Sequence, residues 1–267
     1  MLTNAVSTGR GFLKTALGYT PLGSPLRTWY RRRRAVKDLC SWSRNDEPAL
    51  RFYAHFLRSG DLCFDIGANR GMRTKVFRRL SARVVAVEPQ ESCMAILRRA
   101  YGRDPEVALV QAACGAASGQ AIMRACELDV LSSLSDEWIT AVSNSGRFTP
   151  AWTKQEPCTL ITVDELIRTY GSPAFIKIDV EGYELQVLKG LSRVVPCLSF
   201  EFTPERCEAA AECAERLSGL GFREFNLSRG ESFELLFDPW VQQDELVPLL
   251  RSYREDTVIF GDVYARS

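Results

Sequence analysis

Histidine is nearly absent from this sequence, and its cysteines lack the spacing of a metal site. His55 is the single histidine among 267 residues, and the nine cysteines include no C-x-x-C pair. Structural zinc sites need clustered Cys and His ligands, so we assign no residue as a metal ligand. Cys63 and Cys197 fall within short apolar runs typical of buried strands. We expect the thiols to be reduced, as in intracellular proteins.

Long apolar runs are also missing. No stretch approaches the roughly 18–20 apolar residues of a membrane span, and Lys14 interrupts the apolar run near the N-terminus, which makes a poor secretory signal. Residues 1–37 contain no acidic residue, a composition that fits either an organellar transit peptide or a basic surface helix. We favour the basic helix and expect a cytoplasmic protein, with an organellar location as the alternative.

A large excess of charge is absent from the whole chain but present in its parts. The formal net charge is +1, which argues against a strongly basic nucleic-acid binder and an acidic disordered chain. Residues 1–44 nevertheless hold nine basic residues and one acid, while residues 45–267 hold 25 basic residues and 32 acids. We expect a basic N-terminal extension, 1–44, that contacts an anionic surface, and a folded domain, 45–267, with no nucleic-acid partner.

Short apolar runs alternate with amphipathic segments from residue 46 onward. A β-α-β-α-β succession predicts a mostly parallel sheet with right-handed crossovers and helices on both faces. The segment 115–162 is less regular and predicts a short hairpin, a loop and a helix near 135–143. Strands are expected at 62–66, 83–88, 107–112, 174–179, 197–202, 222–227 and, antiparallel near the edge, 257–264; helices are expected near 25–40 and at 48–58, 72–80, 91–101, 163–170, 182–191 and 204–220.

The turn after the first expected strand predicts a nucleotide-type site. Gly67 and Gly71 allow close approach of the backbone to a ligand. Glu88 follows Gly67 by 21 residues at the end of the next strand, where a carboxylate can accept both ribose hydroxyls of an adenosine. A dinucleotide site would use G-x-G-x-x-G, but Asn69 replaces the second glycine. Asp65 would also repel a pyrophosphate and attract a cationic amino-acid tail or a sulfonium.

A second group of charged residues closes the strand expected at 174–179. Ligands of open parallel sheets bind at the carboxyl ends of the strands, so Asp179 and Glu181 are expected to face the same crevice as Gly67 and Glu88. Both acids are candidates for a general base or for orienting an acceptor. Alternatively, Asp179 caps the following helix and Glu181 only interacts favourably with the positive end of the helix dipole. Lys177 lies within the strand and would need a carboxylate partner if it is buried.

Taken in order, these motifs resemble the FkbM-type family of S-adenosylmethionine-dependent methyltransferases over residues 45–265. The resemblance implies a Rossmann-like class I methyltransferase fold with seven strands, the last antiparallel. It also implies S-adenosylmethionine as cofactor and O-methylation of a hydroxyl on a sugar, glycan or natural product. The matching stretches are DIGANRG at 65–71, VEP at 87–89, TLITVDEL at 159–166, IKIDVEG at 176–182, the helix 184–190 and FGDVYA at 260–265.

The resemblance also implies the site residues, transferred by position. Glu88 would hold the ribose, with Pro89 beside it, and Asp179 would lie near the transferred methyl group with Glu181 close by. Gln111 and Ala113 are the candidates for adenine contacts. The methionine part of the cofactor would lie against Asp65, Gly67, Ala68, Asn69 and Gly71.

Several alternatives remain open at the level of sequence. His55 is a conceivable base, but a surface histidine is the more common outcome. Ser132 and Ser133 either touch a ligand or lie in an exposed loop. The same fold without catalysis would give a cofactor-binding scaffold protein. An NAD(P)-dependent oxidoreductase is disfavoured because the third glycine and a Tyr/Lys catalytic pair are missing. Acceptor specificity is expected in loops 115–158 and 228–256.

Overall fold

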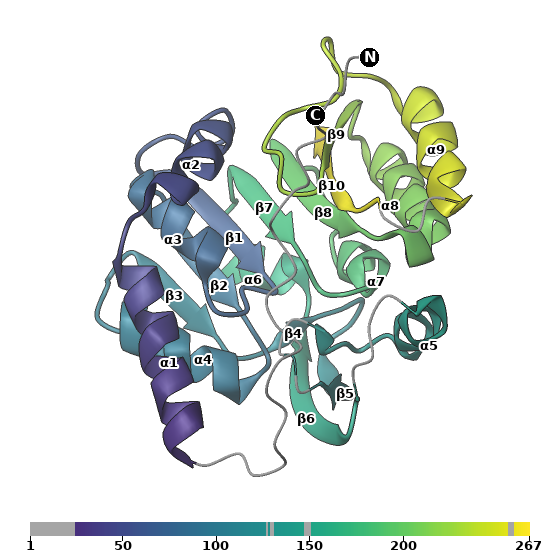
Figure 1. The fold of residues 1–267 in the computed structure, drawn as a ribbon. Helices are drawn as coiled ribbons and strands as arrows, with labels where there is room; N and C mark the ends of the chain where they lie inside the picture. The colour runs from purple at the N-terminus through teal and green to yellow at the C-terminus, as the bar shows by residue number, and fades with distance from the viewer. Residues whose placement is uncertain (1–24, 127, 129–130, 147–150, 256–258) are drawn as a thin grey trace, which may run out of the picture.

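The protein is built on one seven-stranded sheet (Figure 1). The computed structural model describes residues 25–267 apart from 127, 129–130, 147–150 and 256–258. The strand order is β3-β2-β1-β7-β8-β10-β9, and all strands are parallel except β10, which runs antiparallel to β8 and β9. The strands are β1 (Leu62–Ile66), β2 (Arg83–Val87), β3 (Val107–Val110), β7 (Phe175–Ile178), β8 (Cys197–Phe202), β9 (Glu224–Arg229) and β10 (Gly261–Arg266).

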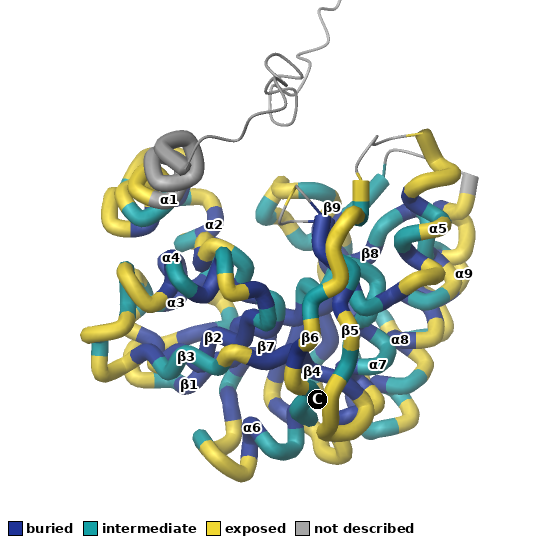
Figure 2. Tube along the Cα trace, turned by 90° about the horizontal axis from the view of Figure 1, so that it is seen from below, coloured by how far each residue is buried: buried dark blue, intermediate teal, exposed yellow. Residues whose placement is uncertain are grey.

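Helices cover both faces of this sheet, as the alternating pattern predicts (Figure 1). One face carries α2 (Glu47–Tyr53), α3 (Met72–Arg79) and α4 (Glu91–Tyr101), with α1 (Pro25–Cys40) packed against α4. The other face carries α6 (Val163–Tyr170), α7 (Glu184–Lys189), α8 (Cys207–Leu220) and α9 (Gln243–Ser252). The strands are mostly buried and the outer faces of the helices are exposed (Figure 2). The predicted Rossmann-like α/β architecture is therefore confirmed.

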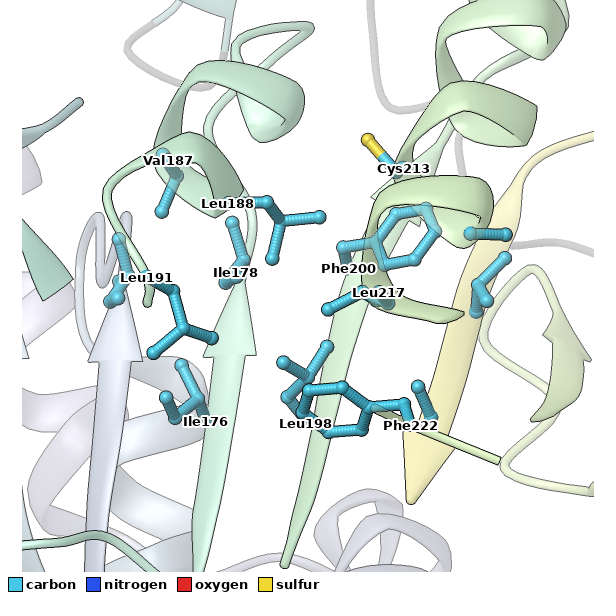
Figure 3. Packing of buried hydrophobic residues seen from close by; sticks show 14 of the residues in the cluster. Ile176, Ile178, Val187, Leu188, Leu191, Leu198, Phe200, Cys213, Leu217 and Phe222 are labelled. Atoms are coloured by element: carbon cyan, nitrogen blue, oxygen red, sulfur yellow. The ribbon is translucent and has the colours of Figure 1, made fainter. Parts of the chain in front are cut away.

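The two faces of the sheet differ in chemistry because successive side chains of a strand point to opposite sides. Ile176 and Ile178 of β7 pack with Leu198 and Phe200 of β8 against α7 and α8 (Figure 3). The intervening Lys177 belongs to the opposite face and is also buried. One face thus forms an apolar core, while the other combines aromatic packing with buried charge.

A second, three-stranded sheet lies beside the carboxyl ends of the main strands. It consists of β4 (Ala113–Cys114), β6 (Lys154–Ile161) and β5 (Gly119–Ala125) in that order, and β5 pairs antiparallel with β6. The helix α5 (Asp136–Ser145) follows β5 in the chain. The helix expected in 115–162 is present. In place of the expected short hairpin, β5 pairs with the eight-residue β6, which follows α5 in the chain.

Some predicted boundaries were wrong. The helix expected to reach residue 58 ends at Tyr53, because the next residues form tight turns in which the His55 amide bonds the Phe52 carbonyl. The last parallel strand begins at Glu224 instead of 222. Residues 228–256 were expected to be loops, yet they contain α9, a helix that keeps Pro248 in its interior, where proline usually argues against a helix.

The described part of the N-terminal extension is attached to the domain. α1 occupies the expected helix near 25–40, and its Leu39 is buried beside Gly71. Trp42 donates a hydrogen bond from Nε1 to Glu47 Oε1 at 2.6 Å. Residues 1–24, which carry part of the predicted basic charge, lie outside the described residues. In the remainder of the chain, no helix is both long and apolar enough to cross a membrane.

Candidate active site at the carboxyl end of the sheet

A cavity opens where β1, β2 and β7 end, between the main sheet and the small sheet. Its volume, including the part open to solvent, is about 690 Å³. Such a position is where open parallel sheets bind ligands. The small sheet supplies Ala113, Cys114 and Met123 to its wall. Seven of the residues predicted from sequence line it: Gly67, Asn69, Glu88, Pro89, Ala113, Asp179 and Glu181.

Gly67 brings two loops of the cavity into direct contact. Its φ is +79°, and a Cβ atom added to it would lie 1.8 Å from the backbone oxygen of Asp179. Any side chain would therefore push the end of β1 away from the end of β7. The glycine is required both by its backbone conformation and by this close approach.

Glu88 faces the cavity with its carboxylate already fixed. The side chain is 2% exposed, and its two oxygens accept hydrogen bonds from the backbone amides of Asn69 and Gln90, each at 2.8 Å. The carboxylate therefore lies at the wall of the cavity in an orientation that the backbone fixes.

Four other predicted residues do not line the cavity. Ala68 is buried in the core on the α2–α4 face, and Gly71, at φ +86°, lies against the side chain of Leu97. Gln111 points elsewhere, because it bonds Arg98 and Glu91 on the exposed surface. The prediction that Gln111 reaches the adenine subsite does not agree with this position.

Asp65 is the fourth predicted residue that does not line the cavity, because it is buried and hydrogen-bonded inside the protein. It is 2% exposed, and Thr74 Oγ1 donates a hydrogen bond to its Oδ2 at 2.5 Å. Burial raises the pKa of Asp65, although the hydrogen bond from Thr74 and the charge of Lys177 act in the opposite direction. The carboxylate thus joins β1 to α3 below the turn, while Gly67 and Asn69 of the turn line the cavity.

Lys177 has the carboxylate partners that its burial requires. Its Nζ lies 2.6 Å from Asp262 Oδ1 and 3.4 Å from Asp179 Oδ2. Burial alone would lower the pKa of Lys177, but attraction to Asp179 and Asp262 holds it well above the ordinary value. Lys177 is therefore charged and connects the last strand of the sheet with the edge of the cavity.

Three carboxylates gather where β7 and β8 end. One oxygen from each of Asp179, Glu181 and Glu201 lies within 4.8 Å of the other two. Burial, and then repulsion from Asp179, raises the pKa of Glu181 and Glu201 well above the usual range. Lys177 already supplies a positive charge to this group, so the arrangement by itself does not call for a metal ion.

The loop that carries Glu181 has a specific backbone conformation. Glu181 has a φ of +54°, and its carbonyl accepts a hydrogen bond from Ser133 Oγ at 2.6 Å. A Cβ on Gly182 would lie 2.4 Å from Trp138 Cβ, so α5 packs directly on this loop. Glu184 Oε1 accepts the amides of Val180 and Gly182, both at 3.1 Å. The acids are thus held by packing from two sides.

Glu201 is the acidic residue that the sequence reasoning missed. It lies near the carboxyl end of β8 (Cys197–Phe202), next to β7 in the sheet. The rule that selects Asp179, a charged residue where a parallel strand ends, would also have selected Glu201. Of the two serines left open, both Ser132 and Ser133 line the cavity. His55 is exposed and is not among the lining residues.

Comparison with solved structures gives distant similarities only. A TehB-like SAM-dependent methyltransferase from Corynebacterium glutamicum is 11% identical, with 91% of this chain and 100% of that chain covered and a TM-score of 0.45. A precorrin-6y C5,15-methyltransferase from Geobacter metallireducens is 10% identical. The alignment covers 82% of this chain and 87% of that chain, and the TM-score is 0.43. Among curated proteins, no sequence matches.

The family comparison is more informative. Residues 65–224 match the model of the methyltransferase FkbM domain, which is more than half of the chain and includes both loops of the cavity. The strand order, with β10 antiparallel between β8 and β9, is the seven-stranded class I methyltransferase arrangement that the resemblance implies. On these grounds the protein belongs to the FkbM methyltransferase domain family.

Proposed function

We propose that the protein is an S-adenosylmethionine-dependent methyltransferase acting on a hydroxyl of a sugar, glycan or natural product. The observation that carries the cofactor assignment is the pair formed by Gly67 and Glu88. Gly67 lines the cavity and lets the ends of β1 and β7 approach each other, which a side chain would prevent, and Glu88 presents a carboxylate fixed by two backbone amides. An acidic residue at the end of the second strand, beside a close turn after the first, fits the ribose of S-adenosylmethionine.

The remaining walls fit the adenine and methionine parts. The apolar side chains Met123, Leu134 and Ala112 are part of the cavity lining, and such a lining can bury a flat aromatic base. Asn69 and Asp179 offer polar groups on the side nearer to β1 and β7. When bound, S-adenosylmethionine supplies a methyl group attached to a positively charged sulfur.

Asp179 is the proposed base. It lines the cavity, its side chain is 34% exposed, and it lies beside Glu181 and Glu201. A neutral hydroxyl needs to lose its proton as its oxygen forms the new bond to carbon. In this proposal the proton passes to a carboxylate oxygen of Asp179, and the chain aligns the two reactants while it excludes water.

The carboxylate cluster also favours a neutral, hydroxylated acceptor. Carboxyl groups whose pKa is raised, such as Glu181 and Glu201, can be protonated and then both donate and accept hydrogen bonds. Hydroxyl groups match this capacity. A polyanion such as RNA would meet Asp179 and its neighbours at the same place and would be repelled.

Two measurements test this proposal. Isothermal titration should show binding of S-adenosylhomocysteine and none of NAD; tight binding of NAD without S-adenosylhomocysteine would refute the cofactor assignment. Methyl-labelled S-adenosylmethionine should then be offered with neutral glycans, hydroxylated small molecules and RNA in parallel. We expect label in a hydroxylated compound, whereas label in RNA alone would contradict the acceptor assignment.

A further inference from the structure

A chain of three charged residues crosses the sheet and ends at the cavity. Lys177, in the centre of β7, is 1% exposed and pairs with β1 on one side and β8 on the other. Its Nζ lies 2.6 Å from Asp262 on β10 and 3.4 Å from Asp179. The order Asp262–Lys177–Asp179 therefore leads from the antiparallel strand to the site.

The two carboxylates that flank Lys177, those of Asp262 and Asp179, are not equivalent. The Asp262 side chain is 12% exposed and is the closer partner of Lys177, whereas the Asp179 side chain is 34% exposed and lines the cavity. A cation compensates its nearest counter-ion most strongly. Lys177 and Asp262 therefore hold the Asp179 carboxylate from behind, on the side away from the cavity.

We infer that Lys177 and Asp262 are positioning residues that keep the Asp179 carboxylate directed into the cavity, where it selects a sulfonium over the neutral thioether of the product. This inference rests on the proposed function. It assigns to this ion pair a role in preferring S-adenosylmethionine to S-adenosylhomocysteine. Such a preference helps product leave and substrate enter the same site.

The surroundings of Asp179 explain why the lysine is needed. Glu181 and Glu184 face it from the segment that follows β7, Glu201 from β8 and Asp65 from β1. Within the described residues, Lys177 is the cation that contacts Asp179. Without Lys177, repulsion from these acids would no longer be opposed, and the Asp179 carboxylate would leave the position in which it faces the ligand.

The main test is the double variant Lys177→Met/Asp262→Asn. It removes both charges of the buried pair and leaves no uncompensated ion, which single removal would do. The affinities for S-adenosylmethionine and S-adenosylhomocysteine are measured by titration calorimetry at about pH 6 and about pH 9. We expect the preference for S-adenosylmethionine to fall about tenfold relative to the wild type at both pH values, because the carboxylate is no longer held in position.

The single variant Asp262→Asn gives an independent result. Lys177 then has Asp179 as its remaining close partner, so the pair is neutral and the preference for S-adenosylmethionine should fall at both pH values. A purely structural role would weaken both ligands alike and would leave their ratio unchanged. Unchanged ratios in both variants at both pH values would overturn the inference.

A matched control is available in the same protein. Lys75 and Asp46 form another buried pair, 2.8 Å apart with side chains 7% and 10% exposed, and neither lines the cavity. Lys75→Met/Asp46→Asn should leave the ligand ratio unchanged. If the wild type binds neither ligand, the proposed function itself fails; if it binds both and only the variant ratios stay unchanged, only this inference fails.

Discussion

Glu88 shows how single residues of this site are prepared by the backbone around them. The sequence pattern selects it as an acid at the end of a strand, and the structure adds that the amides of Asn69 and Gln90 hold both of its oxygens. Asp65 shows the opposite outcome. It stands just before the turn in the sequence, yet its bond to Thr74 directs it into the protein.

Replacing Glu88 by alanine should weaken S-adenosylhomocysteine binding. The change removes a charged acceptor for the ribose and leaves two amides without their partner, which costs about 1–3 kcal/mol of binding free energy. Titration calorimetry measures the loss. Glu106→Ala is the control, because Glu106 is an exposed acid just before β3. This variant should bind S-adenosylhomocysteine with the affinity of the wild type. An unchanged affinity for Glu88→Ala would remove Glu88 from the site.

Gly67 offers a test of close approach that is separate from backbone strain. Gly67→Ala should lower both stability and ligand affinity, because its Cβ would lie 1.8 Å from Asp179 O. Gly60→Ala is matched in conformation, with φ +87°, but has no atom within 4 Å of its Cβ. Thermal denaturation and titration of both variants should show a modest cost at Gly60 and loss of binding only at Gly67. If both variants lost the same stability and affinity, the positive φ alone, and not the close approach to Asp179, would explain the effect of Gly67→Ala.

At the scale of elements, the site depends on how helices meet the ends of strands. The first turn of α7 is formed where Glu184 accepts two loop amides, and α5 packs on Gly182 through Trp138. Sequence periodicity predicted both helices. It could not predict that α5 packs on the loop before α7, because β6, α6 and β7 lie between the two helices in the sequence.

Glu184 makes this junction sensitive to pH. Burial raises its pKa to about 7, even though backbone hydrogen bonds act against this. A carboxyl whose pKa is higher in the folded state binds more protons when folded, so its contribution to stability is lost as the pH rises from about 4.5 through about 7. Glu184→Gln keeps an acceptor oxygen and removes the titration.

We therefore expect Glu184→Gln to gain stability relative to the wild type as the pH increases. The difference between about pH 5 and pH 8 should approach 3 kcal/mol in the free energy of unfolding, measured by urea denaturation. Gln186→Glu, a change on the same helix at a less buried position, serves as a control for added charge. A difference that does not depend on pH would show that the Glu184 carboxyl does not titrate in this interval.

For the whole molecule, the question is where the basic N-terminal extension ends and the acidic domain begins in the structure. Leu39 is buried beside Gly71, and both Lys75 and Arg79 lie over the ring of Trp42. The C-terminal part of the extension is thus packed on the domain. Arg33, Arg34 and Lys37 of α1 are exposed, and we propose that they and the preceding residues contact an anionic surface.

Removal of residues 1–32 should therefore separate the two roles. We expect S-adenosylhomocysteine affinity to stay within about twofold of the full chain, because Leu39 and Trp42 are retained. Binding to vesicles that contain anionic lipid should weaken, and more so at low salt, since the attraction is electrostatic. Equal vesicle binding by both proteins would contradict the surface role, while loss of folding would show that the removed residues support the domain.

Local sequence patterns were enough to predict most strands and helices of the main sheet in their order along the chain, the parallel sheet, and the two loops of the site. Alternation of apolar residues and the placement of glycines and acids at strand ends are local properties, so they can be read along the chain. Pro248 inside α9 shows where such local rules fail, because packing of Leu246, Val247 and Leu250 outweighs the proline.

Which acids lie together at the cavity depends on contacts between segments that are distant in the sequence. Asp179, Glu181 and Glu201 meet because β7 and β8 are neighbours, and Asp262 reaches Lys177 from a strand 85 residues later in the sequence. Gln111 and Asp65 left the predicted site because nearer partners, Arg98 and Thr74, engage them. A side chain forms the hydrogen bonds that its folded neighbours offer, and those neighbours are fixed by the packing of segments distant in the sequence.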